Sequence, residues 1–268
     1  MIETKERIQL PMMALRGLTV FPNMAISFPV GRQKSLDALE VADEGDKRIF
    51  LVAQRDPEDA SPEQMGLYEF GTVATIKQIL KLPGNMTHVI VEGVIRGRLE
   101  TVQHKRKCDY AEITTIAQDF PELPEVHTAA EMRIAQDLYE EYAKFVPNTT
   151  AVDLLPNVLA SGKPGKLADV IAAGLEISFD RKQRILEILN PYDRLQAVME
   201  IMRYEQQVLR VKREIEAKTK DAIDKNQREY FLREELKVIQ EELGDKDGIG
   251  ADAAQFRRRL EEKTPPEE

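Results

Sequence analysis

The segment that comes nearest to a nucleotide-binding loop is Ser161-Gly162-Lys163-Pro164-Gly165-Lys166-Leu167. A phosphate-binding loop needs a glycine-rich turn whose backbone N–H groups cradle the phosphates at the start of a helix. Lysine and a hydroxyl residue that holds magnesium must follow. Here Ala160 stands where the first glycine is needed, and Leu167 stands where Ser or Thr is needed. We therefore interpret the segment as a loop between helices, and we expect no cofactor to bind to this chain.

The histidines and the single cysteine lack the spacing of a metal site. His88, His104 and His127 are scattered along the sequence, and Cys108 has no second cysteine as a partner. A basic run at residues 104–107 precedes Cys108, and a neighbouring positive charge lowers the pKa of an accessible thiol. We favour the alternative, an inert cysteine beside a solvated basic turn. We expect no catalytic, cofactor-binding or metal-binding residue.

Two groups of apolar loop residues have the chemistry to hold unfolded polypeptide, which needs exposed apolar side chains that tolerate many sequences. The first group is Phe21, Pro22 and Met24, in the first loop. The second is Pro83 and Met86, at the tip of a predicted hairpin. The alternative is that these side chains fold back and cap one end of an open barrel. We state both groups as polypeptide-binding hypotheses.

The first 118 residues, which carry both loops, have the periodicity of β-strands. The predicted strands are Ala25–Val30, Gly71–Leu82, His88–Leu99 and Tyr110–Ala117, with one amphipathic helix at Lys34–Ala42. Pro83-Gly84-Asn85 supplies the turn of the hairpin. Gly93 and Gly97 indicate bulges or sharp bends, as a small curled sheet requires.

The composition changes at residues 119–124, where two prolines rule out both a helix and a central strand. We place a linker there, between a β-rich part at 1–118 and a helical part at 125–190. Ala129–Phe145 has the apolar stripe of a core helix. The predicted fold class is α+β: a small β-barrel-like lobe, then a helical bundle lobe with one very long C-terminal helix.

That helix is predicted from the run Tyr192–Leu243, which contains neither glycine nor proline. At about 1.5 Å per residue it would be roughly 78 Å long, a length typical of an arm or a partner surface. Apolar residues are sparse at 212–226 and then return at Tyr230, Phe231, Leu232, Leu236 and Ile239. We expect these five to contact partners; the alternative is an ordinary surface helix with a polar middle.

The predicted division of this part is a projecting helix at 191–243 and a flexible joint at 244–268. A heptad row runs along the helix through Leu195, Met202, Leu209, Ile223 and Tyr230. Glu216 and Lys237 interrupt this row, so we expect weak self-association rather than a tight coiled coil. The formal net charge of −9, from 38 basic and 47 acidic residues, argues against nucleic-acid binding. One cysteine, no signal-peptide pattern and no long apolar run indicate a reducing, cytoplasmic setting without a membrane partner.

The residues Ile215-Glu216-Ala217-Lys218-Thr219-Lys220 and the run from Lys225 to Gly244 closely resemble the helix that precedes the ATPase module of Lon proteases. Leu10-Pro11, Val20-Phe21-Pro22 and Pro29-Val30-Gly31-Arg32 resemble the start of the same family, in its bacterial LonA type. The resemblance implies a PUA-like fold for residues 1–118. It also implies a full-length homohexamer with an AAA+ unfoldase, which uses ATP and magnesium, and a Ser-Lys peptidase.

The sequence stops at Glu268, short of the other two modules that the resemblance implies, and contains no segment like the family's catalytic serine motif. We therefore interpret it as a non-catalytic fragment for substrate recognition and assembly, whose partners are unfolded or damaged proteins and neighbouring subunits. One alternative is a free-standing adaptor that uses the long helix as a spacer. Another is an RNA-binding PUA-like protein, which the charge balance opposes.

Overall fold

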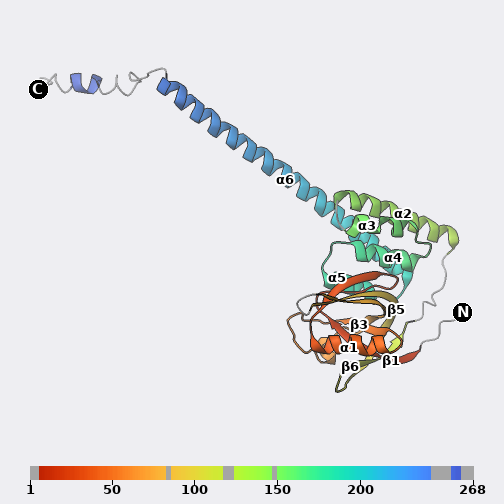
Figure 1. Cartoon of the computed structure of the whole chain (residues 1–268). Coiled ribbons are helices and arrows are strands. Elements are labelled where there is room, and N and C mark those ends of the chain that lie inside the picture. The colour runs from red at the N-terminus through yellow and green to blue at the C-terminus, as the bar shows by residue number, and fades with distance from the viewer. Residues whose placement is uncertain (1–5, 83–85, 117–123, 147–149, 243–254, 261–268) are drawn as a thin grey trace, which may run out of the picture. The chain divides into compact units, whose positions relative to one another are not determined.

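The computed structural model describes residues 6–82, 86–116, 124–146, 150–242 and 255–260. It is a mixed α+β structure with a β-sheet lobe, helices and one long C-terminal helix, which confirms the predicted fold class (Figure 1). The chain divides into two compact units, Met1–Gln207 and Val208–Glu268.

The elements follow one another in the order that the sequence implies, with strands first and helices after. The β-rich part contains β1 (Arg7–Leu15), β2 (Ala25–Val30), α1 (Gln33–Glu44), β3 (Arg48–Ala53), the 3-10 helix η1 (Gln64–Gly66), β4 (Phe70–Leu82), β5 (Met86–His104) and β6 (Asp109–Thr115). The helical part contains α2 (Glu125–Phe145), α3 (Thr150–Leu159), α4 (Pro164–Gly174), α5 (Phe179–Glu187) and α6 (Pro191–Glu242).

The strands close into a small barrel. The sheet order is β2-β5-β4-β3-β1-β6, and β6 also pairs with β5, so that β5, β4, β3, β1 and β6 form a ring. Closure depends on the length of β5: its first part pairs with β2, and its last part, from Gly97 to His104, pairs with β6. All pairings between the described strands are antiparallel except that of β1 with β3, and the crossover between these two parallel strands contains β2 and α1.

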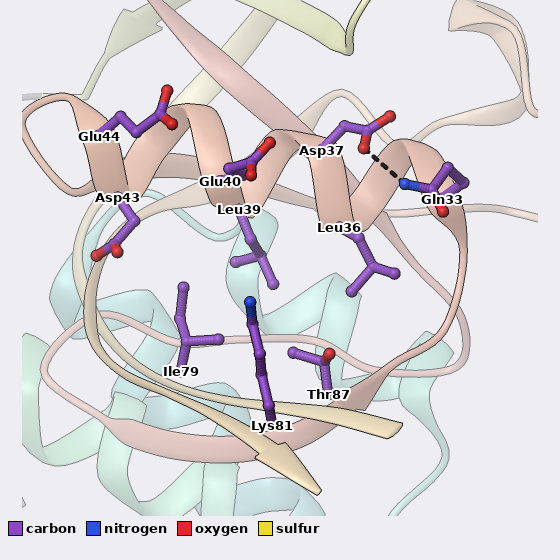
Figure 2. A pocket seen from close by; sticks show the side chains of 10 residues that line it. All are labelled: Gln33, Leu36, Asp37, Leu39, Glu40, Asp43, Glu44, Ile79, Lys81 and Thr87. Carbon is purple, nitrogen blue, oxygen red and sulfur yellow. Dashed lines mark hydrogen bonds between the residues drawn. The ribbon is translucent and has the colours of Figure 1, made fainter. Parts of the chain in front are cut away.

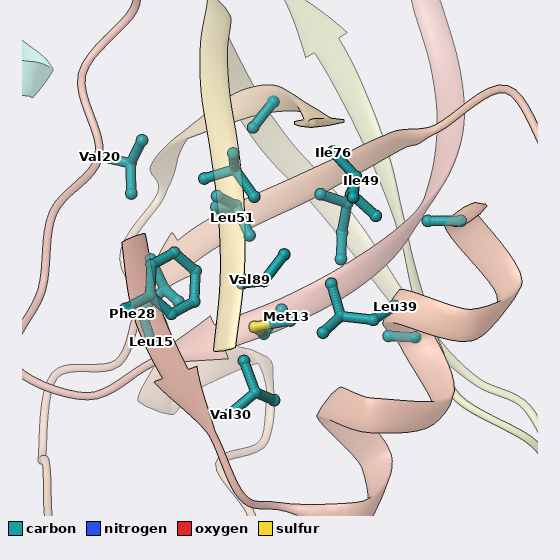
Figure 3. Packing of buried hydrophobic residues seen from close by; sticks show 14 of the residues in the cluster. Met13, Leu15, Val20, Phe28, Val30, Leu39, Ile49, Leu51, Ile76 and Val89 are labelled. Carbon is teal, nitrogen blue, oxygen red and sulfur yellow. The ribbon is translucent and has the colours of Figure 1, made fainter. Parts of the chain in front are cut away.

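Alternate residues of the strands enter two separate hydrophobic clusters, as the two-residue period of a strand requires. Met13 and Leu51 belong to the cluster that includes Leu39 of α1. Figure 3 shows the side chains of this cluster converging. Met12 and Phe50, their immediate neighbours in sequence, belong to the other cluster. Both faces of β1 and β3 are therefore buried.

The helical part is built around two tyrosines of α2 and the first turns of α6. Tyr139 and Tyr142 are buried, with ring centroids 6.2 Å apart. Leu195, Val198 and Met202 of α6 are fully buried in the same unit. The apolar stripe that the sequence places at the start of the long helix thus belongs to the core of this unit.

A buried ion cluster joins the barrel to the helices. Both guanidinium Nη atoms of Arg96, on β5, donate to the carboxylate of Asp169, on α4, and Nε of Arg194, on α6, lies 3.0 Å from the same carboxylate. Arg96 Nε donates to the Leu186 carbonyl oxygen, and Arg194 Nη1 donates to that of Leu189. We call Arg96, Asp169 and Arg194 the Asp169 clasp.

The clasp is almost dry, since the side chains of Arg96, Asp169 and Arg194 are 4%, 0% and 1% exposed. Burial lowers the pKa of Arg194 to about 10, although Asp169 opposes the shift. Together with the hydrogen bonds from Gln183 to the Phe70 carbonyl oxygen and from Tyr68 to Asp180, these contacts connect the barrel to the helices within the compact unit 1–207. The predicted linker at 119–124 lies mostly outside the described residues and stays a prediction.

Candidate polypeptide-binding surfaces

The first predicted binding loop folds against the barrel. Phe21 is 1% exposed and Pro22 is also buried, while Met24 is half-buried. Asn23 N–H donates to the Gly93 carbonyl oxygen at 2.8 Å, and Gly93 N–H donates to that of Met24 at 2.8 Å. The expectation that Phe21 and Pro22 present apolar surface is therefore wrong, because backbone hydrogen bonds hold the loop on β5. Phe21 and Pro22 instead fold back onto the barrel, as the alternative interpretation of the sequence predicts.

Gly93→Ala is expected to lower the free energy of unfolding by about 1–3 kcal/mol. A Cβ atom at Gly93 would overlap the carbonyl oxygen of Phe21 and would lie 3.2 Å from Cα of Pro22. Both are backbone atoms that cannot rotate away. Urea unfolding followed by circular dichroism measures the loss. Gly162→Ala is the matched control, because a Cβ there meets nothing within 4 Å; an equal loss in both variants would contradict the explanation.

The second predicted group lies at the end of the β4–β5 hairpin. Pro83 lies outside the described residues, and only the backbone of Met86 is described, paired with Leu82. The adjacent pair of the hairpin, Lys81 and Thr87, is described in full. The proposal for Pro83 and Met86 therefore stays a prediction, and the structure adds what surrounds the end of the hairpin.

A groove of 790 Å³ runs between α1 and this end of the hairpin. Leu36 and Leu39 point from α1 toward the strands, and Ile79 of β4 lies opposite them (Figure 2). Leu39 is buried, whereas Leu36 and Ile79 remain half-buried and so offer apolar surface. Lys81 extends from β4 toward α1 between Ile79 and Thr87. No local sequence pattern predicts this groove, because its two sides come from α1 and the β4–β5 hairpin.

Carboxylates line the α1 side of the groove. Asp37, Glu40, Asp43 and Glu44 recur on the helix, and Lys81 is the only cation among the described residues that line the groove. Nζ of Lys107, on the turn between β5 and β6, lies 2.9 Å from Glu40 and 4.0 Å from Glu44. The hydrogen bond from Lys107 lowers the pKa of Glu40 and raises the pKa of Lys107. This side of the groove therefore accommodates an ammonium group.

The five predicted partner residues of α6 are exposed. The exposed fractions of Tyr230, Phe231, Leu232, Leu236 and Ile239 are 63%, 70%, 54%, 56% and 47%. Every residue from Arg210 to Glu241 is exposed. Leu232, Leu236 and Ile239 recur at i, i+4 and i+7, so they form one row on the helix. Tyr230 lies nearly opposite Leu232 around the helix, so the five residues surround it rather than form one row. We call the five residues the distal apolar face; whether it binds a partner stays a prediction.

The groups that the sequence singled out for chemistry are held in structural roles. Cys108 is buried, and burial raises the pKa of its thiol, so the basic run before it does not activate it. Lys105 of that run stacks instead on the ring of Tyr110, at 4.0 Å from the centroid. Helix α4 begins at Pro164, and Leu167 is fully buried, as expected for a loop that leads into a core helix.

The structure adds two observations on metal and membrane sites. The described residues hold no group of three or more His, Cys, Asp or Glu side chains that is placed to bind a metal ion. Within the described part of the chain, no helix combines the length and the apolar composition that crossing a membrane requires.

Comparison with known proteins gives one family. Residues 9–204 match the family model of the "ATP-dependent protease La (LON) substrate-binding domain". The chain is 38% identical over 258 residues to the Lon protease of Clostridium acetobutylicum, covering 96% of this chain and 33% of that protein. It is 38% identical over 265 residues to the Lon protease of Brevibacillus choshinensis, covering 99% of this chain and 34% of that protein. The chain spans about a third of the length of these curated relatives.

Two solved structures share the fold. The N-terminal domain of the Mycobacterium avium complex Lon protease superposes with a TM-score of 0.59 at 17% identity, covering 73% of this chain and 98% of that chain. A Lon N-terminal domain protein from Xanthomonas campestris gives a TM-score of 0.52 at 15% identity, covering 72% and 98%. At these identities the likeness is one of fold alone.

Proposed function

Because the chain belongs to the family of ATP-dependent protease La (LON) substrate-binding domains, we propose that it binds unfolded or damaged polypeptide and delivers it to the AAA+ motor and peptidase chamber of a Lon-type serine protease. The observation that carries this proposal is the family match over residues 9–204. The groove between α1 and the β4–β5 hairpin supports it, since half-buried Leu36 and Ile79 offer apolar surface that unfolded polypeptide can cover.

The proposal assigns the chemistry to other parts of the longer protein. Residues 1–268 would themselves hydrolyse neither ATP nor peptide bonds, and ATP and magnesium would act at the AAA+ module. Ala160 and the buried Leu167 support this, because both replace residues that a phosphate-binding loop needs. Cys108, the one cysteine, is free and buried, which suits a reducing, cytoplasmic setting.

The proposal also gives the long helix a role in assembly. The distal apolar face would contact neighbouring subunits or the ATPase ring of a homohexamer, so that α6 links substrate capture to the motor. The family match ends at residue 204, within α6, and Phe231 and Leu236 lie well beyond it. Contact with a partner would remove these apolar side chains from water.

NMR titration tests the proposed substrate binding. The isotope-labelled chain is titrated with a chemically unfolded protein and, separately, with the native form of the same protein. We expect shifts at Met24, at Met86 and in the groove beside the hairpin with the unfolded form alone. Apolar loop contacts of this kind bind weakly and release, so the shifts should grow with concentration. Absence of shifts with both forms would overturn substrate binding by this chain.

A matched pair of methionine variants checks the location. Met86→Asp is expected to weaken binding of the unfolded protein, with little change in the melting temperature. Met65→Asp is the control, because Met65 is 91% exposed on η1, a different part of the barrel. Equal weakening by both variants would contradict a site at the hairpin and would indicate a general effect of added negative charge.

A further inference from the structure

We propose that the groove between α1 and the β4–β5 hairpin binds stretches of unfolded polypeptide in which a lysine or arginine neighbours an apolar residue. The inference rests on the proposed function and names the class of segment that one site selects. The groove has an apolar floor and an acidic rim.

The floor provides the apolar contact. Leu36 and Leu39 of α1 face Ile79 of β4 across the groove, and half-buried Leu36 and Ile79 still have surface to bury (Figure 2). A leucine-sized side chain that enters this space loses contact with water on several sides. Such burial is favourable for any apolar side chain of suitable size, so the floor alone does not discriminate between sequences.

The rim provides the selection. Four of the five charged side chains that line the groove are carboxylates, those of Asp37, Glu40, Asp43 and Glu44. Asp37 accepts a hydrogen bond from the Gln33 amide at 2.7 Å, and it forms no ion pair within the described part of the chain. Asp43 pairs with Lys47 at 3.7 Å, and Lys107 lies near Glu40 and Glu44, so each of these three carboxylates already has a cation of the protein nearby. A segment with lysine or arginine brings a positive charge to Asp37 and can compete for the other three, whereas an acidic segment meets repulsion.

The protein itself shows a cation on this rim. The ammonium group of Lys107 lies 2.9 Å from Glu40, and the side chains of both are more than half exposed. Exposed ion pairs of this kind are weak, so an incoming lysine or arginine can replace Lys107. A long basic side chain also lays its apolar stem along the floor while its charged end reaches the rim. Lys107 is therefore a competitor of the substrate's cation.

Because Lys107 competes with the cation of the substrate, a variant without Lys107 should bind the substrate more tightly. Lys107→Gln is expected to tighten binding of a basic apolar peptide roughly two- to five-fold, because it removes the competitor from the rim. The double change Asp37→Asn and Glu40→Gln is expected to weaken binding by a similar factor. Glu58→Gln, at an exposed position outside the groove, is the matched control and should change nothing.

Fluorescence anisotropy measures these affinities with labelled peptides in a glycine-serine frame. One peptide alternates leucine with lysine, a second has glutamate in place of lysine, and a third has serine in place of leucine. We expect the first to bind best, with an affinity that falls as salt is added. Equal binding of the lysine and glutamate peptides would overturn the proposal. So would a Lys107→Gln variant that binds the lysine peptide no better than the unchanged chain.

Binding of an unfolded acidic protein, with its cysteines reduced and alkylated, is measured as well. This measurement distinguishes failure of the groove proposal from failure of the proposed function. If that protein binds while the groove variants leave every peptide affinity unchanged, the groove proposal fails and substrate binding by the chain stands. If neither that protein nor any peptide binds, the proposed function fails as well.

Discussion

The Asp169→Ala variant is expected to lose about 3–5 kcal/mol of its free energy of unfolding. Asp169 is fully buried and is the carboxylate that pairs with both Arg96 and Arg194. Its removal leaves two buried guanidinium groups facing each other without a counter-charge. Arg194 already has a lowered pKa from burial, so its charged form depends on Asp169 for compensation. A decrease in the melting temperature on the order of 10 °C should follow.

Calorimetry and urea unfolding measure this loss, and Glu69→Ala is the matched control. Glu69 pairs with Arg98, which lies two residues after Arg96 on β5, but both side chains of that pair are about half exposed. Removing an exposed pair of this kind costs about 1 kcal/mol or less. If Asp169→Ala were no more destabilising than Glu69→Ala, the clasp would not be what joins the barrel to the helices.

The elements predicted best from the sequence are those that local chemistry determines. The predicted helix Tyr192–Leu243 is observed as Pro191–Glu242, because a long run without glycine or proline leaves few alternatives to one helix. The strand Ala25–Val30 has the predicted bounds. Gly93 was expected at a bulge, and the β4–β5 register shifts there, leaving Val94 without a partner on β4.

Two strands were not predicted individually, for a physical reason. Residues of β1 and β3 enter hydrophobic clusters on both faces, so neither strand shows the alternation of apolar and polar residues by which strands are recognised. Pro11 also argues against a strand at β1. It is tolerated because β1 pairs with β6 as far as Pro11 and with β3 from Met12 onward, so the missing N–H falls where the partner changes.

The candidate sites were predicted less well because they depend on residues far apart in the sequence. Nothing local to Phe21 shows that its loop closes on Gly93, 72 residues later. The carboxylates of the groove lie on one predicted helix, but the opposite side comes from Ile79, Lys81 and Thr87. Arg96 and Asp169 resemble ordinary surface charges in the sequence, and only the fold brings them together without water.

The double variant Phe231→Asp and Leu236→Asp is expected to abolish self-association of the chain. The unchanged chain should associate weakly and in a concentration-dependent way, since Glu216 and Lys237 interrupt the heptad row. Burial of a phenylalanine and a leucine contributes about 1.5–3 kcal/mol each, so their replacement should weaken association roughly 100-fold or more. Sedimentation velocity over a concentration series measures the change.

Thermal unfolding of the same variant separates a lost contact from a lost fold. Phe231 and Leu236 are 70% and 56% exposed, so their replacement removes nothing from a core and the melting temperature should stay unchanged. The control is Ile215→Asp with Ile223→Asp, at exposed positions in the polar middle of the same helix. Equal loss of association in the control would place the contact along the whole helix rather than at the distal apolar face. A tight dimer at all concentrations would contradict the interrupted heptad as the reason for weak pairing.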